Sequence, residues 1–171
     1  DMALEIEYQI DAPESAMAGG NLMVVATVTF GDMLISKTMT VMTSDHTKTK
    51  IDVFHKTNGQ TNCGMEWGVR TWSPESPDLY DITFEVVSDG KIFDTVGSYF
   101  AMREIRIDGS NILLNGHPLY QRLILDQGYW KDSHLTPPSE EALIEDIDKI
   151  HALGYNGLRK HQKIEDERFL Y

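Results

Sequence analysis

The chain has 171 residues, of which 41% are hydrophobic, and it carries a net charge of −12. These values predict a soluble globular protein of one domain or one and a half, and the acidic balance argues against nucleic acid or an anionic membrane as a partner. No apolar run approaches the ~18 residues that span a bilayer. Cys63 is the single cysteine, so no intramolecular disulfide can form, and the compartment stays open between cytoplasmic, periplasmic and secreted.

Residues 1–104 carry an alternating pattern that predicts a β-sandwich domain. Leu4, Ile6 and Tyr8 alternate with polar residues, which is typical of a strand with one buried and one wet face. The segment from Leu22 to Phe30 is apolar almost throughout and suits a central strand. Further strand patterns lie at Leu34–Val41, Lys50–Phe54, Met65–Trp67, Tyr80–Val87 and Lys91–Ala101. Six or seven short strands at this spacing predict a mainly β chain with a two-sheet sandwich of the immunoglobulin type.

Residues 105–171 predict alternating strands and helices instead. Strand patterns at Leu119–Asp126 and Tyr155–Arg159 flank a helical pattern from Ser139 to Leu153, and a further helix starts at Asp166. A helix of this length between two strands brings them back parallel. The βαβα order therefore predicts the opening of a (β/α)8 barrel, which is incomplete because a whole barrel needs about 200 residues or more.

The predicted helix carries its own start and stop signals. Ser139 is placed to cap the amino end, where Glu140 and Glu141 favour the helix dipole. Gly154 is the expected residue just beyond the carboxyl end. The apolar residues of the helix form one stripe, which is predicted to be core: Leu143, Ile144, Ile147, Ile150 and Leu153.

Three segments carry a resemblance to a known family. Trp72–Tyr80, Leu113–Leu119 and Gly154–Arg159 occur in the order and spacing seen in glycoside hydrolase family 2, which includes β-galactosidases, β-glucuronidases and β-mannosidases. The resemblance implies that the sandwich is the family's immunoglobulin-like domain and that the remainder is the first quarter of its catalytic barrel. The family's amino-terminal jelly-roll domain would lie before Asp1.

The resemblance also implies that the chemistry lies at the carboxyl ends of the barrel strands. Loops 126–130 and 159–163 follow the two predicted strands and would form part of the active-site mouth. In the family, an Asn-x-x-Arg pattern places its Arg near the catalytic nucleophile. Arg159 would thus help to keep a carboxylate ionised, while Asn156 supports the loop. Trp130 is the predicted platform for a sugar ring.

Departures from the family pattern distinguish the chain from a standard β-galactosidase or β-glucuronidase. Many family members follow the Arg with one residue and then Ser-His-Tyr-Pro, whereas this chain reads Lys160-His161-Gln162-Lys163. Gln162 stands where that His would fall, so His161 does not simply inherit its role. The first strand ends with Asp126 and Gln127 rather than in an Asn-x-His-Glu pattern. These two residues either contact sugar hydroxyls or anchor the loop. The predicted substrate-binding residues are Asp126, Gln127, Trp130, Arg159, His161 and Gln162.

No catalytic residue is predicted within the chain. Retaining glycosidases need an acid/base carboxyl and a nucleophilic carboxylate. In this family the acid/base Glu follows an Asn, and the sequence has no Asn-Glu dipeptide. Lys160 and Lys163 would suit an acidic sugar but are interpreted as solvated. The acids nearby are interpreted as solvated or as dipole partners: Glu140, Glu141, Glu145, Glu165 and Glu167. The chain is thus predicted to come from a glycosidase and to hydrolyse nothing alone.

No metal or cofactor is predicted, because the six histidines show no ligand spacing. Carbohydrate is the predicted partner of the intact enzyme, and the unpaired edges of the truncated barrel predict self-association. Two hypotheses of another class remain open, namely a non-catalytic carbohydrate-binding module and a structural immunoglobulin-like spacer. Saturable sugar binding by the sandwich would favour the binding module.

Overall fold

The computed structural model describes residues 3–54 and 68–170. The chain divides into two compact units, the first formed by residues up to 106 with 114–116, and the second by 107–113 with the rest of the chain. The predicted strand Met65–Trp67 and Cys63 lie outside the described residues.

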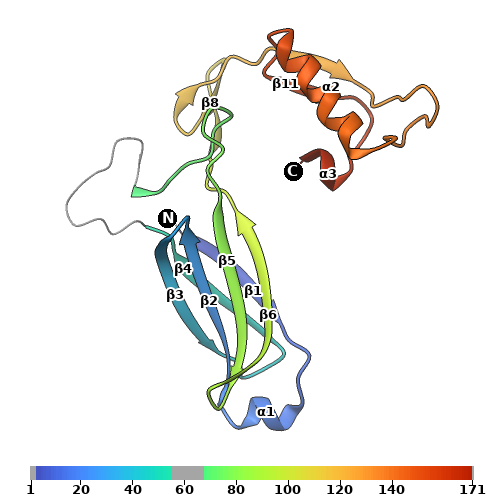
Figure 1. The fold of residues 1–171 in the computed structure, drawn as a ribbon. Helices are drawn as coiled ribbons and strands as arrows, with labels where there is room; N and C mark the ends of the chain where they lie inside the picture. The colour runs from blue at the N-terminus through green and yellow to red at the C-terminus, as the bar shows by residue number, and fades with distance from the viewer. Residues whose placement is uncertain (1–2, 55–67, 171) are drawn as a thin grey trace. The chain divides into compact units, whose positions relative to one another are not determined.

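The long strands belong to the first unit. Its elements are β1 (Ala3–Gln9), α1 (Glu14–Ala18), β2 (Leu22–Phe30), β3 (Met33–Val41), β4 (His46–Asp52), β5 (Tyr80–Ser88) and β6 (Lys91–Phe100). The order β3-β2-β5-β6 makes a four-stranded antiparallel sheet, and β1 pairs with β4 in a two-stranded antiparallel sheet. Figure 1 shows the β1–β4 pair lying across one face of the larger sheet, so the two sheets form the predicted sandwich.

The core of the sandwich lies between its two sheets. Val28 of β2, Ile51 of β4 and Tyr80 of β5 are fully buried in one hydrophobic cluster. β2 is hydrogen-bonded to β3 on one side and to β5 on the other, which confirms the prediction of a central strand. Burial of each such side chain contributes about 1.5–3 kcal/mol, so the shared cluster accounts for much of the cohesion between the sheets.

The short helix α1 has no counterpart in the predicted elements. It occupies only five residues between β1 and β2, begins after Pro13 and ends at Gly19. Pro13 has a φ of −57°, which its ring favours just before a helix, but a single turn is too short to display the period of 3.6 residues on which the prediction of helices depends.

The remaining elements follow β6 along the chain. They are β7 (Ile105–Asp108), β8 (Asn111–Leu114), β9 (His117–Pro118), β10 (Leu123–Asp126), α2 (Glu140–Ala152), β11 (Gly157–Lys160) and α3 (Glu167–Leu170). The strands β7, β8 and β9 form one three-stranded sheet, and β10 pairs with β11 in parallel. The prediction of two parallel strands joined by a helix is therefore confirmed.

Both parallel strands begin later than predicted. β10 begins at Leu123 rather than Leu119, and β11 begins at Gly157 rather than Tyr155. The reason is Asn156, whose side chain accepts a hydrogen bond of 2.7 Å from the backbone N–H of Arg122 and donates one of 2.8 Å to the carbonyl of Tyr120. A side chain thus takes the place of a ladder partner at the amino ends of the strands.

The helix α2 confirms its predicted cap but only part of its predicted core. The Ser139 hydroxyl accepts a hydrogen bond of 3.2 Å from the backbone N–H of Ala142. Leu143 is buried, whereas Ile144 and Leu153 are 53% and 74% exposed, so the stripe as a whole is not core in this chain. Among the described residues, no helix has the length and apolar character required to cross a membrane.

Candidate functional site

The predicted substrate-binding residues gather where β10 and β11 end. The register pairs Asp126 with Lys160, the last residues of the two strands, so the loops that follow start at the same edge of the sheet. The backbone N–H of His161 donates a hydrogen bond of 2.9 Å to the carbonyl of Asp126 across this edge. The carboxyl edge of a parallel strand pair is where α/β folds build their ligand sites.

Gln127 and His161 form a polar pair on this edge. Nε2 of Gln127 lies 3.0 Å from Nδ1 of His161. Because an amide NH2 group only donates, Nδ1 must accept in this arrangement, and the proton of the neutral ring then lies on Nε2. Gln127 is exposed and His161 is half-buried, so the pair can offer both donors and acceptors to hydroxyl groups.

The carboxylate of Asp126 is held from two sides. Its Oδ1 accepts a hydrogen bond of 2.7 Å from the backbone N–H of Gly128, and its Oδ2 is bonded to the ammonium of Lys160. Burial raises the pKa of Asp126, but these hydrogen bonds and the charges of Lys160 and Lys163 outweigh it, and the pKa falls below its usual range. With both oxygens occupied, the arrangement has the features of the loop anchor that the sequence left open as an alternative.

Glu165 was expected either on a solvated face or as a helix-dipole partner, and the first of these interpretations is wrong. Its side chain is only 4% exposed, and its Oε1 lies 3.0 Å from Nζ of both Lys160 and Lys163. Burial raises the pKa of Glu165, yet the bonds and charges of the two lysines outweigh it and lower the pKa. The lysines are 19% and 14% exposed, so they are not solvated either.

Arg159 lies on β11, and Trp130 lies in the loop that follows β10. Arg159 is exposed and pairs in register with Leu125, on the face of the strands opposite to Asp126 and Lys160. Trp130 lies in a small turn closed by backbone hydrogen bonds with His134 of 2.6 and 3.1 Å.

Gln162 and the strand face of Leu125 complete the surroundings. Gln162 is exposed and has a φ of +57°, a conformation that is uncommon outside glycine and turns the chain sharply after His161. Leu123 and Leu125 are 40% and 56% exposed on the face that also bears Arg159. Self-association through this segment stays a prediction, which light scattering at rising protein concentration tests.

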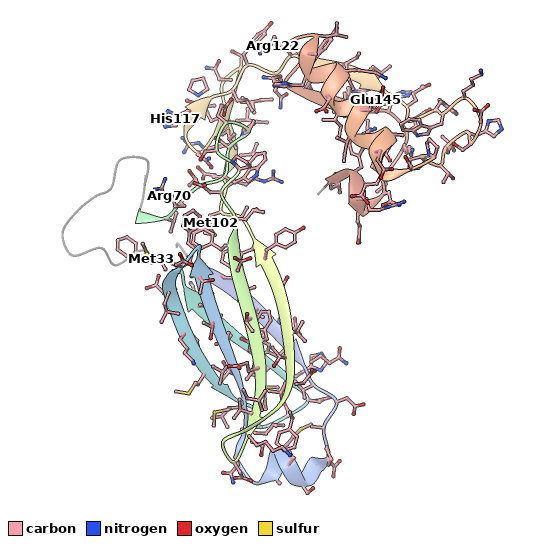
Figure 2. The ribbon with its side chains drawn as sticks, in the orientation of Figure 1. Met33, Arg70, Met102, His117, Arg122 and Glu145 are labelled. Carbon is pink, nitrogen blue, oxygen red and sulfur yellow. The ribbon has the colours of Figure 1, made fainter. Side chains whose placement is uncertain are left out.

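The amino ends of the strands are fixed independently of the mouth. The guanidinium Nε of Arg122 donates a hydrogen bond of 2.9 Å to the carbonyl of Gly154, in addition to the bonds of Asn156. Figure 2 shows Arg122 at the start of β10, beside the end of α2. Asn156 therefore holds the amino ends of the two strands, and its predicted support of the mouth loop stays a prediction. Among the residues that the structure describes, no group of three or more His, Cys, Asp and Glu could hold a metal ion.

Comparisons with known proteins show which family the chain resembles. The sequence profile "Glycosyl hydrolases family 2" matches residues 26–103. "Beta-galactosidase BgaC" of Bifidobacterium adolescentis is 39% identical over 56 residues, which are 32% of this chain and 5% of that protein.

Solved structures show the same fold. A family 2 β-galacturonidase from Eisenbergiella tayi, bound to glycerol, is 27% identical, covers 87% of this chain and 24% of its own, and superposes with a TM-score of 0.62. A β-glucuronidase from Parabacteroides merdae is 16% identical, covers 98% of this chain and 19% of its own, and has a TM-score of 0.69. The chain therefore spans about a fifth to a quarter of these solved relatives. In residues 26–103 and in its fold, the chain is thus similar to the glycosyl hydrolases of family 2, as the resemblance of its sequence motifs implied.

Proposed function

We propose that the chain is part of a glycoside hydrolase that cleaves β-linked sugars by the retaining mechanism, with its catalytic Glu pair outside these 171 residues. The observation that carries the proposal is the Gln127–His161 pair at the carboxyl edge of a parallel strand pair. In a relative of family 2, this edge is where hydrogen-bonding groups would meet a sugar.

The fold assignment is part of the same proposal. The first unit corresponds to an immunoglobulin-like domain, and β10, α2, β11 and α3 correspond to the start of a (β/α)8 barrel. Tyr80 supports the first assignment, because a tyrosine near the start of a strand whose hydroxyl bonds to upstream backbone is a hallmark of such sandwiches. The parallel pairing through a helix supports the second.

The chain alone is proposed to bind sugar weakly and to hydrolyse none. A retaining mechanism requires two carboxyl groups about 5–5.5 Å apart with access to the glycosidic bond. Asp126 and Glu165 are both engaged by lysines that hold them in the ionised form, so neither is suited to the acid role. No Asn-Glu dipeptide occurs elsewhere in the sequence.

Two measurements on the purified chain test this. Titration with methyl β-D-galactopyranoside, followed by amide NMR, should move the signals of Gln127 and His161, and Gln127→Ala should abolish the response. Gln121→Ala is the matched control, because Gln121 is an exposed glutamine just before β10. Shifts confined to sandwich residues would contradict the proposal and favour a binding module. Nitrophenyl β-galactoside, β-glucuronide and β-galacturonide should show no turnover, and turnover removed by a point substitution in this chain would refute its inactivity.

A further inference from the structure

Two lysines and two carboxylates alternate in a chain of ion pairs beside the Gln127–His161 pair. The ammonium of Lys160 bonds to the carboxylate of Asp126 and lies 3.0 Å from Oε1 of Glu165. The ammonium of Lys163 lies 3.0 Å from the same oxygen. The sequence of charges is therefore negative, positive, negative, positive, and the four groups together are neutral.

This cluster, formed by Asp126, Lys160, Lys163 and Glu165, is shielded from water. The four side chains are between 4% and 19% exposed. Charges at this depth are costly unless each is paired, and removal of one partner leaves another without compensation. The ion pairs of the cluster therefore constrain geometry much more strongly than those on the open surface. Lys149 and Glu145 on α2 show the contrast, since they lie 2.7 Å apart but are 66% and 68% exposed.

The cluster also forms hydrogen bonds with the backbone of the first loop, which follows β10. Asp126 accepts a hydrogen bond from the N–H of Gly128, and Lys163 donates one of 3.2 Å to the carbonyl of Gly128 and one of 3.0 Å to that of Leu135. Lys163 belongs to the second loop, so the two loops that follow β10 and β11 are fastened to each other by charged side chains rather than by strand pairing.

The residues held by the cluster flank the polar pair. Gln127 lies between Asp126, which belongs to the cluster, and Gly128, whose backbone is bonded to it, and His161 follows Lys160 directly. The cluster thus determines where the backbone of each member of the pair lies. Since Gln127 is exposed and lies 3.0 Å from the half-buried His161, a ligand can reach the pair through Gln127.

We propose that Lys160, Lys163 and Glu165 are positioning residues, which hold the two strand-end loops together through Asp126 and Gly128 and so present Gln127 and His161 as one sugar-contacting unit. The inference rests on the proposed function for the role of the pair, but its structural part is tested without sugar. It assigns separate roles to residues of one edge: Gln127 and His161 contact the ligand, and the charged groups act through them.

The test is nitrogen-15 NMR of the 171-residue chain. In the wild type, Nδ1 of neutral His161 should be the unprotonated ring nitrogen, and the side-chain amide of Gln127 should differ in shift from that of Gln121. Lys160→Met should convert the ring to a mixture of tautomers and move the Gln127 amide toward the shift of Gln121. Lys160→Arg should preserve both signatures, and Lys149→Met, which breaks an exposed pair, should leave them unchanged. Unchanged signatures in Lys160→Met overturn the proposal.

A second variant and a second readout separate the possible failures. If Lys160→Met loses the dispersed amide signals of α2, Glu165→Gln, which preserves side-chain shape, takes its place in the same comparison. With methyl β-D-galactopyranoside as the probe, Lys160→Met should raise Kd at least about tenfold, whereas Lys149→Met should leave it within about twofold. If the sugar moves neither Gln127 nor His161 while Lys160→Met changes both signatures, the proposed function fails and the positioning role stands.

Discussion

The hydroxyl of Tyr80 accepts a hydrogen bond of 2.7 Å from the backbone N–H of Arg70. Tyr80 is the first residue of β5 and is fully buried, and its ring stacks on that of Phe100 with centroids 5.1 Å apart. One side chain thus joins the core of the sandwich to a backbone segment ten residues upstream. Burial raises the pKa of Tyr80, so the hydroxyl stays neutral throughout the physiological range.

Tyr80→Phe should lower the free energy of unfolding by about 1–3 kcal/mol, because the ring still fills the core but the N–H of Arg70 loses its acceptor. Urea unfolding followed by far-ultraviolet circular dichroism measures the change. Tyr129→Phe is the control, since Tyr129 is 69% exposed and water can take the place of its hydroxyl as a hydrogen-bond partner. Equal losses in the two variants would show that the Arg70 bond does not matter.

Asn115 makes a second buried connection within the first unit. Its side chain accepts a hydrogen bond of 3.0 Å from the N–H of Glu104 and donates one of 2.9 Å to the carbonyl of Trp72, and it is 6% exposed. Its φ of +51° lies in the left-handed region. Asn115→Gly should cost about 1–3 kcal/mol for each backbone group left without a partner.

Asn115→Ala should cost about 1–2 kcal/mol more than Asn115→Gly, because alanine loses the same bonds and also pays the penalty of a Cβ at positive φ. Comparison of the two midpoints of urea unfolding separates the bonds from the backbone conformation. A glycine variant as stable as the wild type would show that the bonds to Glu104 and Trp72 contribute nothing.

Elements whose signal is local to the sequence could be predicted. β2 was predicted because a continuous apolar run indicates a strand covered on both faces. The Ser139 cap was predicted because a serine just before a helical pattern can accept a hydrogen bond from a free backbone N–H of the first turn. The order of strand, helix and strand gave the parallel pairing of β10 with β11. The site residues Asp126, Gln127 and His161 were placed at one edge by the same argument.

Features that depend on partners distant in sequence could not be predicted. The pairing of Lys160 with Asp126 joins residues 34 positions apart, and nothing in the local pattern distinguishes a buried lysine from a solvated one. For Ile144 and Leu153, periodicity identified the apolar stripe but not which elements, if any in this chain, would pack against it. The shortened start of β10 depends on the Asn156 side chain, which no strand pattern includes.

The charged cluster should make the strand pair sensitive to acid. The pKa values of Asp126 and Glu165 are lowered by their lysine partners, so these groups stabilise the folded state at pH values above the ordinary carboxyl range. This contribution should be lost as the pH falls from about 4 through the depressed values. Urea unfolding between pH 6 and pH 2, followed by the amide signals of Ile124 and Leu158, measures it.

The double variant Asp126→Asn/Glu165→Gln should show a flatter dependence on pH, because the titrating groups are gone. Asp166 provides the control. Hydrogen bonds from Arg168 lower its pKa to about 2, but the pair lies on the surface, where water screens it. Asp166→Asn should therefore leave the acid sensitivity of the strand pair unchanged. A loss of that sensitivity in Asp166→Asn would show that it comes from Asp166 and not from Asp126 and Glu165.

Replacement of Gly128 by alanine should destabilise the chain more than the same replacement at a glycine of similar backbone geometry elsewhere. Its φ is +65°, and a Cβ built on it would lie 2.5 Å from Nζ of Lys163 and 2.7 Å from Oε1 of Glu165. Gly109 has a φ of +58°, but a Cβ there would meet nothing within 4 Å. Gly109→Ala should cost only the penalty of a left-handed alanine, about 1–2 kcal/mol.

Gly128→Ala should cost more than Gly109→Ala, because the new methyl group must displace an ammonium that is bonded to Glu165 and to two backbone carbonyls. The excess over Gly109→Ala in urea unfolding therefore measures how firmly the charged cluster is packed against the first loop. The tip of a lysine can move cheaply when it is solvated, so equal costs at the two glycines would mean that Lys163 yields freely. In that case it would not fix the loop that carries Gln127.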